Sequence, residues 1–417
     1  MADEQITELF KALKIDDIIR HGTSFLISGF LSFVWISLPF FLVANHIPLL
    51  FLGVIYSIAV LTAVLIRLPL RFYVERSRTD LLPTVGLLLS GIAMSLLFTV
   101  TSLIGIILSF IVFSVSISFY RASKSSSKPK GIRNMEPMRN LYSQDIVPNT
   151  GIFILLIFAA LFVNGSIREL YGVMSVIGLL LGFIALLYRV TRGGKTQQVI
   201  SPTPFKQMIR QSFEPIASFD RITSRRILIP YIAIQSLLYL SICIVAVFLP
   251  AMGLHDGVPR QEIFLVFAAF SVIAFLLDRS AALIPMKFVR DTFYVFRPIF
   301  LIIPLLLLSL LSSSIIFIIG YFTLLLWIFA DSLSSDVVTS LMPEGDRIRA
   351  PILMGFLSIP IAVAGPAIGS LLWMASPRLL YGFAILPAAI SLLLAMMAFQ
   401  GISRKAGNET AKVGKEL

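Results

Sequence analysis

Long stretches without any charged residue constrain this chain more than any other feature of its sequence. No Asp, Glu, Lys or Arg occurs between Arg20 and Arg67, or between Asp80 and Arg121. A helix that crosses a bilayer needs about 20 apolar residues, and a charge near the bilayer centre costs about 2.5–3.5 kcal/mol. Each stretch is therefore too long for one span, and we expect each to contain two.

Turn signals divide the uncharged stretches and give the number of spans. They are Asn45-His46-Ile47-Pro48, Ser312-Ser313-Ser314 and Ser376-Pro377-Arg378, with a less obvious one near Thr99-Val100-Thr101. With these divisions the sequence predicts twelve membrane-spanning helices, six on each side of a polar segment at 191–226. The composition agrees, because 13% of the residues are charged, against about 25% in soluble domains.

The basic residues predict the orientation of the chain. If both termini and the connections after even-numbered spans lie on one side, that side holds 31 of the 34 Lys and Arg residues. Cytoplasmic connections carry such an excess, so we expect a multi-pass protein of the plasma membrane with both termini in the cytoplasm. The net charge of +12 is explained by this topology, and no nucleic-acid partner is expected.

The two halves of the chain contain an internal repeat. The heptapeptide that begins at Ser166 (SIRELYG) and the one that begins at Ser376 (SPRLLYG) share five of seven residues at an offset of 210, and each enters the sixth span of its half. The same offset carries Arg121 to Asp331. Because both halves start on the cytoplasmic side, we interpret them as parallel repeats.

The predicted organisation is all-α, with two six-helix bundles related by pseudo-two-fold symmetry. Its parts are a cytoplasmic N-terminus (1–21), a first bundle (22–190), a cytoplasmic linker (191–226), a second bundle (227–401) and a cytoplasmic tail (402–417).

The chain resembles the major facilitator superfamily in its six-plus-six architecture and in two local stretches. The run from Asp336 through Pro343-Glu344 to Arg347, followed by Gly365-Pro366, is similar to the family's loop and eleventh span. The loop that contains Glu75-Arg76 is similar to the family's signature loop, although Arg71 and Arg78 stand where that signature has glycines. The resemblance implies two bundles that rock about a central cavity, lined chiefly by spans one, four, seven and ten.

Candidate site residues follow from that resemblance and from polarity. The expected conformational or gating residues are Arg71, Glu75, Arg76, Arg78, Asp331 and Arg347. The expected substrate contacts are polar residues of the four cavity-lining spans, namely Ser32, Trp35, Ser109, Ser116, Gln235, Tyr239, Tyr321 and Trp327. Gln235 and Tyr239 are the better candidates, because residues four apart share a helix face.

We expect a secondary active or facilitative transporter of a small solute that works by alternating access, surrounded by lipid and monomeric. A coupling ion is left open, and the scarcity of charge within the spans favours a neutral or amphiphilic solute. No cofactor and no metal are expected. Two alternatives remain: a non-transporting sensor or scaffold with a transporter fold, and a membrane-embedded lipid-modifying enzyme. The enzyme is disfavoured because His21, His46 and His255 are scattered along the chain.

Overall fold

The computed structural model describes residues 15–77, 81–126, 137–163, 165–191, 225–281, 294–341 and 344–416. Within these ranges the chain is helical and contains no strand. The chain divides into two compact units. Unit 1 contains residues 1–47, 58–210 and 259–272, and unit 2 contains 48–57, 211–258 and 273–417.

The first half of the chain forms six helices, separated at the predicted turns. They are α2 (Ile15–Ala44), α3 (Leu50–Ser77), α4 (Leu81–Thr99), α5 (Leu103–Ser126), α6 (Pro137–Phe162) and α7 (Ile167–Thr191). The turns predicted at Asn45 to Pro48 and at Thr99 to Thr101 are confirmed, since α3 begins after the first and α5 after the second.

The second half repeats this order. Its helices are α9 (Arg225–Val245), the 3₁₀ turn η2 (Ala246–Phe248) with α10 (Leu249–His255), α11 (Arg260–Ala281), α13 (Tyr294–Leu310), α14 (Ser314–Leu341), α15 (Glu344–Ala375) and α16 (Pro377–Glu416). Helix α16 continues to Glu416, so the segment expected as a separate tail extends the last helix.

Twelve apolar segments are present in the described part of the chain. Nine are long and apolar enough to span a membrane, and three shorter ones cover Leu50–Ile66, Ile146–Phe162 and Val295–Leu310. The protein is therefore an all-α, multi-pass membrane protein.

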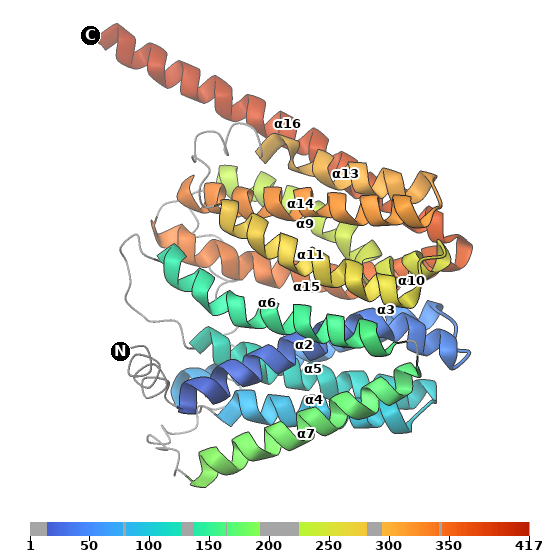
Figure 1. Ribbon diagram of the computed structural model, residues 1–417. Helices are drawn as coiled ribbons and strands as arrows, with labels where there is room; N and C mark the ends of the chain where they lie inside the picture. The colour runs from blue at the N-terminus through green and yellow to red at the C-terminus, as the bar shows by residue number, and fades with distance from the viewer. Residues whose placement is uncertain are drawn as a thin grey trace, which may run out of the picture. The chain divides into compact units, whose positions relative to one another are not determined.

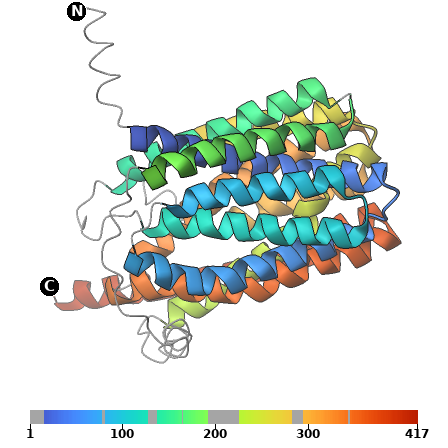
Figure 2. The same ribbon diagram turned by 90° about the horizontal axis from the view of Figure 1, so that it is seen from below.

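Helix starts confirm the internal repeat. The offset found in the sequence carries the first residues of α3 and α7 onto the first residues of α11 and α16, and it carries the start of α5 to the position just before α14. Packing partners repeat as well: α4 packs on α5 and α7 in unit 1, as α13 packs on α14 and α16 in unit 2. The contact of α2 with α6 corresponds in the same way to that of α9 with α15. Figures 1 and 2 show α4 beside α5 within unit 1.

Exposed apolar side chains identify the lipid-facing sides of the last helix in each half. On α7 they are Val173, Val176, Leu180, Phe183 and Leu187, and on α16 they are Phe383, Leu386, Ile390, Leu393 and Met397. Steps of three and four positions place each set on one face of its helix. The offset between the heptapeptides carries every member of the first set onto a member of the second, so the repeat extends to the membrane-facing surface.

Glycines allow several helices to approach closely. A Cβ at Gly178 of α7 would lie 3.0 Å from the Cα of Gly91 on α4, and a Cβ at Gly365 of α15 would lie 2.5 Å from Cys243 Cβ on α9. Gly178 with Gly182 and Gly365 with Gly369 have the GxxxG spacing that permits close contact between membrane helices. Only glycine permits the backbones to come so near at these two positions.

Each unit includes the start of a helix that belongs by sequence to the other half. Residues 48–57, which begin α3, belong to unit 2, and residues 259–272, which begin α11, belong to unit 1. Within unit 2 the Gly53 amide donates to Ser370 Oγ at 3.0 Å, and Ser57 Oγ donates to the Val363 carbonyl at 2.6 Å. Within unit 1 the Phe264 ring lies 6.1 Å from that of Phe33.

Candidate functional site: a buried polar cluster in unit 2

Three side chains from three helices form a polar cluster inside unit 2. Arg297 of α13 donates from Nη1 to Asp331 Oδ1 of α14 at 3.0 Å. Gln235 of α9 donates from Nε2 to the same oxygen at 3.2 Å. The Arg297 side chain is 0% exposed, and the Asp331 side chain is 30% exposed. The cluster therefore combines a fully buried cation with a carboxylate that reaches the surface of the unit.

Helical periodicity explains why Arg297 is buried. The buried face of α13 carries Leu301, Leu305 and Leu308, and Arg297 lies one turn before Leu301 on the same face. Phe296 and Ile303 are exposed on the other side. In the sequence, Arg297 directly precedes an uncharged stretch and would be assigned to a basic connection, but the structure places it in α13. Extending the leucine pattern back by one helical turn would have found it.

The cluster leaves several polar atoms without a described partner. Arg297 Nε and Nη2 and Gln235 Oε1 are buried and have no hydrogen bond within the described residues. Buried polar groups are nearly always hydrogen-bonded in proteins, and burying an unpaired ionic donor is costly. The positions of these atoms therefore call for a further partner.

Two other predicted contacts lie one turn from the cluster. Tyr239 follows Gln235 on α9 and hydrogen-bonds the Cys243 thiol. Trp327 precedes Asp331 on α14, and its buried Nε1 has no partner in the described part of the chain. Tyr321 lies further along α14, where it is buried and stacked on Phe317 at 6.1 Å. In the structure, Gln235 therefore contacts Asp331 directly. Tyr239 and Trp327 lie one helical turn from these two residues on the same helices.

The predicted contacts in unit 1 have mostly structural surroundings. Ser109 donates to Gly105 O within its own helix, and Ser116 donates to Gly86 O of α4 at 2.6 Å. The Trp35 ring lies edge-on to Phe267 at 5.6 Å. Ser32, on α2, is half-buried. The two buried serines bond backbone carbonyls, which is the usual role of serine in membrane helices.

The remaining predicted gating residues have no described side chains. Arg71, Glu75 and Arg76 belong to α3 and Arg347 to α15, but their side chains lie outside the described set. Arg78 lies outside the described residues altogether. Their proposed roles remain predictions.

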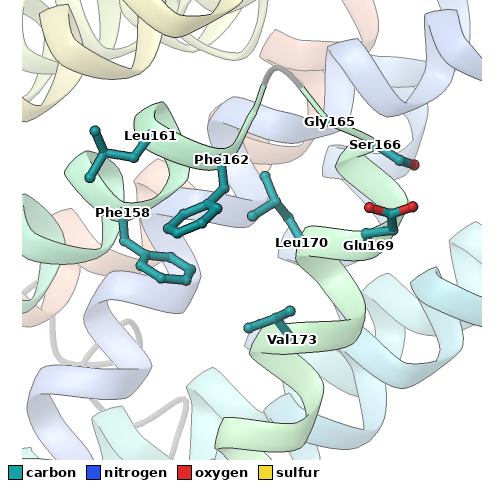
Figure 3. A pocket seen from close by; sticks show the side chains of 8 residues that line it. All are labelled: Phe158, Leu161, Phe162, Gly165, Ser166, Glu169, Leu170 and Val173. Carbon is teal, nitrogen blue, oxygen red and sulfur yellow. The ribbon is translucent and has the colours of Figure 1, made fainter.

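A hollow lies between the loop-side ends of α6 and α7 in unit 1. It has a volume of about 390 Å³ and is lined by Phe158, Leu161, Phe162, Gly165, Ser166, Glu169, Leu170 and Val173. Figure 3 shows the Phe158 and Phe162 rings on one side, Leu170 and Val173 on the other, and Glu169 near the loop. Because Leu161 and Phe162 are exposed apolar side chains, we assign this groove to the lipid-facing surface.

A smaller polar group lies at the turn between α10 and α11. Asp256 is 1% exposed and its Oδ1 is 3.4 Å from His255 Nδ1. Ser314 Oγ donates to the Asp256 carbonyl at 3.2 Å. Burial raises the pKa of the Asp256 carboxyl, and His255 and Arg378 oppose that shift. No group of three or more potential metal ligands occurs among the described residues.

Solved structures with the same fold are transporters. A single-residue variant of the nucleoside transporter NupG superimposes with a TM-score of 0.69 at 13% identity, over 93% of this chain and 100% of that one. The two folds match almost from end to end. The chain has the major facilitator fold. A variant of the peptide transporter POT gives a TM-score of 0.64 at 14% identity (93% and 94% covered).

A bacterial homologue of the human lysosomal transporter Spinster gives a TM-score of 0.65 at 11% identity, with 91% and 95% covered. That structure is described as inward-facing and unoccupied. No family model matches the sequence, and no curated protein matches it. At these identities the similarity concerns the fold, and the residues that bind a solute must be argued from this chain alone.

Proposed function

We propose that this major facilitator protein is a secondary active or facilitative transporter that moves a small solute by alternating access. The observation that carries the proposal is the cluster of Gln235, Arg297 and Asp331, which places an ion pair and unsatisfied polar atoms inside a bundle of apolar helices. Ionisable residues within membrane helices are costly and typically mark substrate or ion pathways. The matching structures, which are nucleoside, peptide and Spinster-type transporters, support the same class.

The cluster supports a role in solute binding for the two helices expected to line the central cavity in the second half. In the resemblance stated above, spans seven and ten line the central cavity, and these correspond to α9 with Gln235 and α14 with Asp331. We propose that Gln235 and Asp331 contact the solute, that Tyr239 and Trp327 extend the contact surface, and that both termini lie in the cytoplasm.

Flux measurements test the proposal. The purified protein is reconstituted into proteoliposomes, and uptake of labelled solutes is measured across a panel that includes nucleosides, short peptides and organic acids. We expect time-dependent, saturable uptake of at least one solute, and its loss in Asp331→Ala. Arg378→Lys, a change at the first turn of α16, is the matched control and should retain flux. Solute-dependent stabilisation with no flux across the panel would contradict transport and favour the sensor.

A further inference from the structure

The unused edge of the Arg297 guanidinium has the geometry of an oxyanion site. One terminal nitrogen, Nη1, is bonded to Asp331. Nε and Nη2 are buried and have no partner within the described residues. In the planar guanidinium these two nitrogens share one edge, and their N–H bonds point in parallel. A carboxylate or phosphate accepts such a pair through two oxygens, and these charge-assisted bonds are about twice as strong as neutral ones.

Gln235 adds a hydrogen-bond acceptor to the two donors of Arg297. Its Nε2 is committed to Asp331 Oδ1, the oxygen that also accepts from Arg297. The two side chains are therefore neighbours. The Gln235 carbonyl Oε1 is buried and has no described partner, so it can accept a hydrogen bond. The cluster thus contains two parallel donors and one acceptor without a described partner.

We infer that this cluster binds an oxyanion, a carboxylate or phosphate, on the Nε–Nη2 edge of Arg297, with a neighbouring hydroxyl or N–H of the same ligand donating to Gln235 Oε1. Asp331 keeps its bond to Nη1, because the guanidinium has five N–H donors and Nη1 is not part of the Nε–Nη2 edge. The inference rests on the proposed transport function and names its substrate class. It replaces the neutral or amphiphilic solute expected from the sequence.

Asp331 also determines how the ligand arrives and how strongly it binds. It is 30% exposed whereas Arg297 is 0% exposed, so an incoming anion meets the carboxylate before it reaches the guanidinium. The negative charge of Asp331 opposes a second anion near Arg297. Replacing Asp331 by asparagine keeps a hydrogen-bond acceptor, removes that repulsion and should tighten anion binding.

Binding in detergent tests the site independently of transport. Calorimetry and thermal unfolding are carried out on the purified protein with inorganic phosphate, L-lactate and propionate. Lactate and propionate differ by one hydroxyl, so their ratio reports the Gln235 contact. We expect phosphate and lactate to bind and stabilise the protein, with propionate weaker.

Three variants and one control assign the contacts. Arg297→Lys should weaken phosphate binding about tenfold or more, because lysine has no two-donor fork and a hydrogen bond to a charged group is worth about 1.5–3 kcal/mol. Gln235→Leu should abolish the preference for lactate over propionate. Asp331→Asn should tighten phosphate binding. Arg378→Lys should change none of these affinities. Unchanged phosphate affinity in both Arg297→Lys and Asp331→Asn would overturn the inference. It would also be overturned if none of the three anions bound and phosphatidylglycerol gave no stabilisation that depends on Arg297.

A lipid headgroup and a free solute can both present an oxyanion to Arg297. A further experiment in lipid nanodiscs distinguishes the two. The protein is placed in nanodiscs of phosphatidylcholine with and without phosphatidylglycerol. Stabilisation by phosphatidylglycerol that depends on Arg297, without binding of soluble anions, assigns the edge to a lipid phosphate. Binding of soluble anions in detergent assigns it to a solute. Arg297-dependent binding without flux supports the oxyanion site and contradicts the carrier, whereas flux of a solute without Arg297-dependent binding does the reverse.

Discussion

Arg297 and Asp331 depend on each other for their positions inside unit 2. The arginine is fully buried, and the ion pair with Asp331 is its only charged contact that the described structure contains. Removing one partner of a buried pair leaves an uncompensated charge, which costs about 3–5 kcal/mol, whereas neutralising both partners can cost much less. The stability contributions of Arg297 and Asp331 should therefore depend on each other.

A double-mutant cycle on Arg297 and Asp331 should show that the effects of the two substitutions are not additive. Arg297→Gln and Asp331→Asn should each lower the free energy of unfolding, the latter by about 3 kcal/mol, because it leaves the fully buried Arg297 charge unpaired. The double variant should be less destabilised than the sum of the two by about 1 kcal/mol or more. Chemical unfolding in detergent measures all four proteins. Simple additivity would show that the two side chains do not interact.

Because the Asp256 carboxyl is buried, we expect the stability of the protein to depend on pH. Burial raises its pKa in the folded protein above that of the unfolded chain. The folded state then binds the proton more tightly, so the contribution to stability is full below the unfolded pKa of about 3.9 and is lost as pH rises through the folded value. Asp256→Asn should remove the loss of stability that this carboxyl causes as the pH rises above about 4. An identical pH profile of the unfolding midpoint in wild type and variant would contradict it.

At the scale of helices, close backbone contact holds α4 against α7. A Cβ added at Gly91 would lie 2.8 Å from the backbone nitrogen of Leu179 and 3.0 Å from the carbonyl carbon of Gly178. Backbone atoms cannot move aside as flexible side chains do. The two helices would have to separate to admit the methyl group.

Gly91→Ala should therefore destabilise the protein by about 1–3 kcal/mol, the usual cost of overpacking. Gly382→Ala is the matched control, because a Cβ there has nothing within 4 Å, and it should be neutral or stabilising. Thermal unfolding in detergent compares the two. Equal effects of both substitutions would mean that the α4–α7 contact is not tight.

The helices and their boundaries were largely predictable from the sequence, whereas the contacts between them were not. The turns, the twelve apolar segments and the offset between the halves all follow from local patterns of charge and apolarity, and the structure confirms them. The partnership of Gln235 with Asp331 could not be predicted, because it depends on which faces of α9 and α14 meet. Arg297 was missed because positive residues beside an apolar stretch normally lie in a connection, whereas helix α13 already begins at Tyr294.

At the scale of the whole molecule, the repeat and the distribution of basic residues make a topological prediction. Cys243 is the only cysteine in the chain, so a Cys243→Ser background allows single-site labelling. Cysteines introduced at Glu4 and Gly414 should react with a membrane-impermeant maleimide from the cytoplasmic side, and one at Gly257 should react from the opposite side. Labelling of the two termini from opposite sides would contradict an even number of spans.

Transport by alternating access requires that the Gln235–Arg297–Asp331 cluster be exposed to each side of the membrane in turn. A Gln235→Cys variant in the Cys243→Ser background is placed in sealed vesicles of both orientations and treated with a membrane-impermeant maleimide. We expect reaction from each side of the membrane, at rates that a bound oxyanion lowers. Reaction from one side alone, with or without anion, would contradict it.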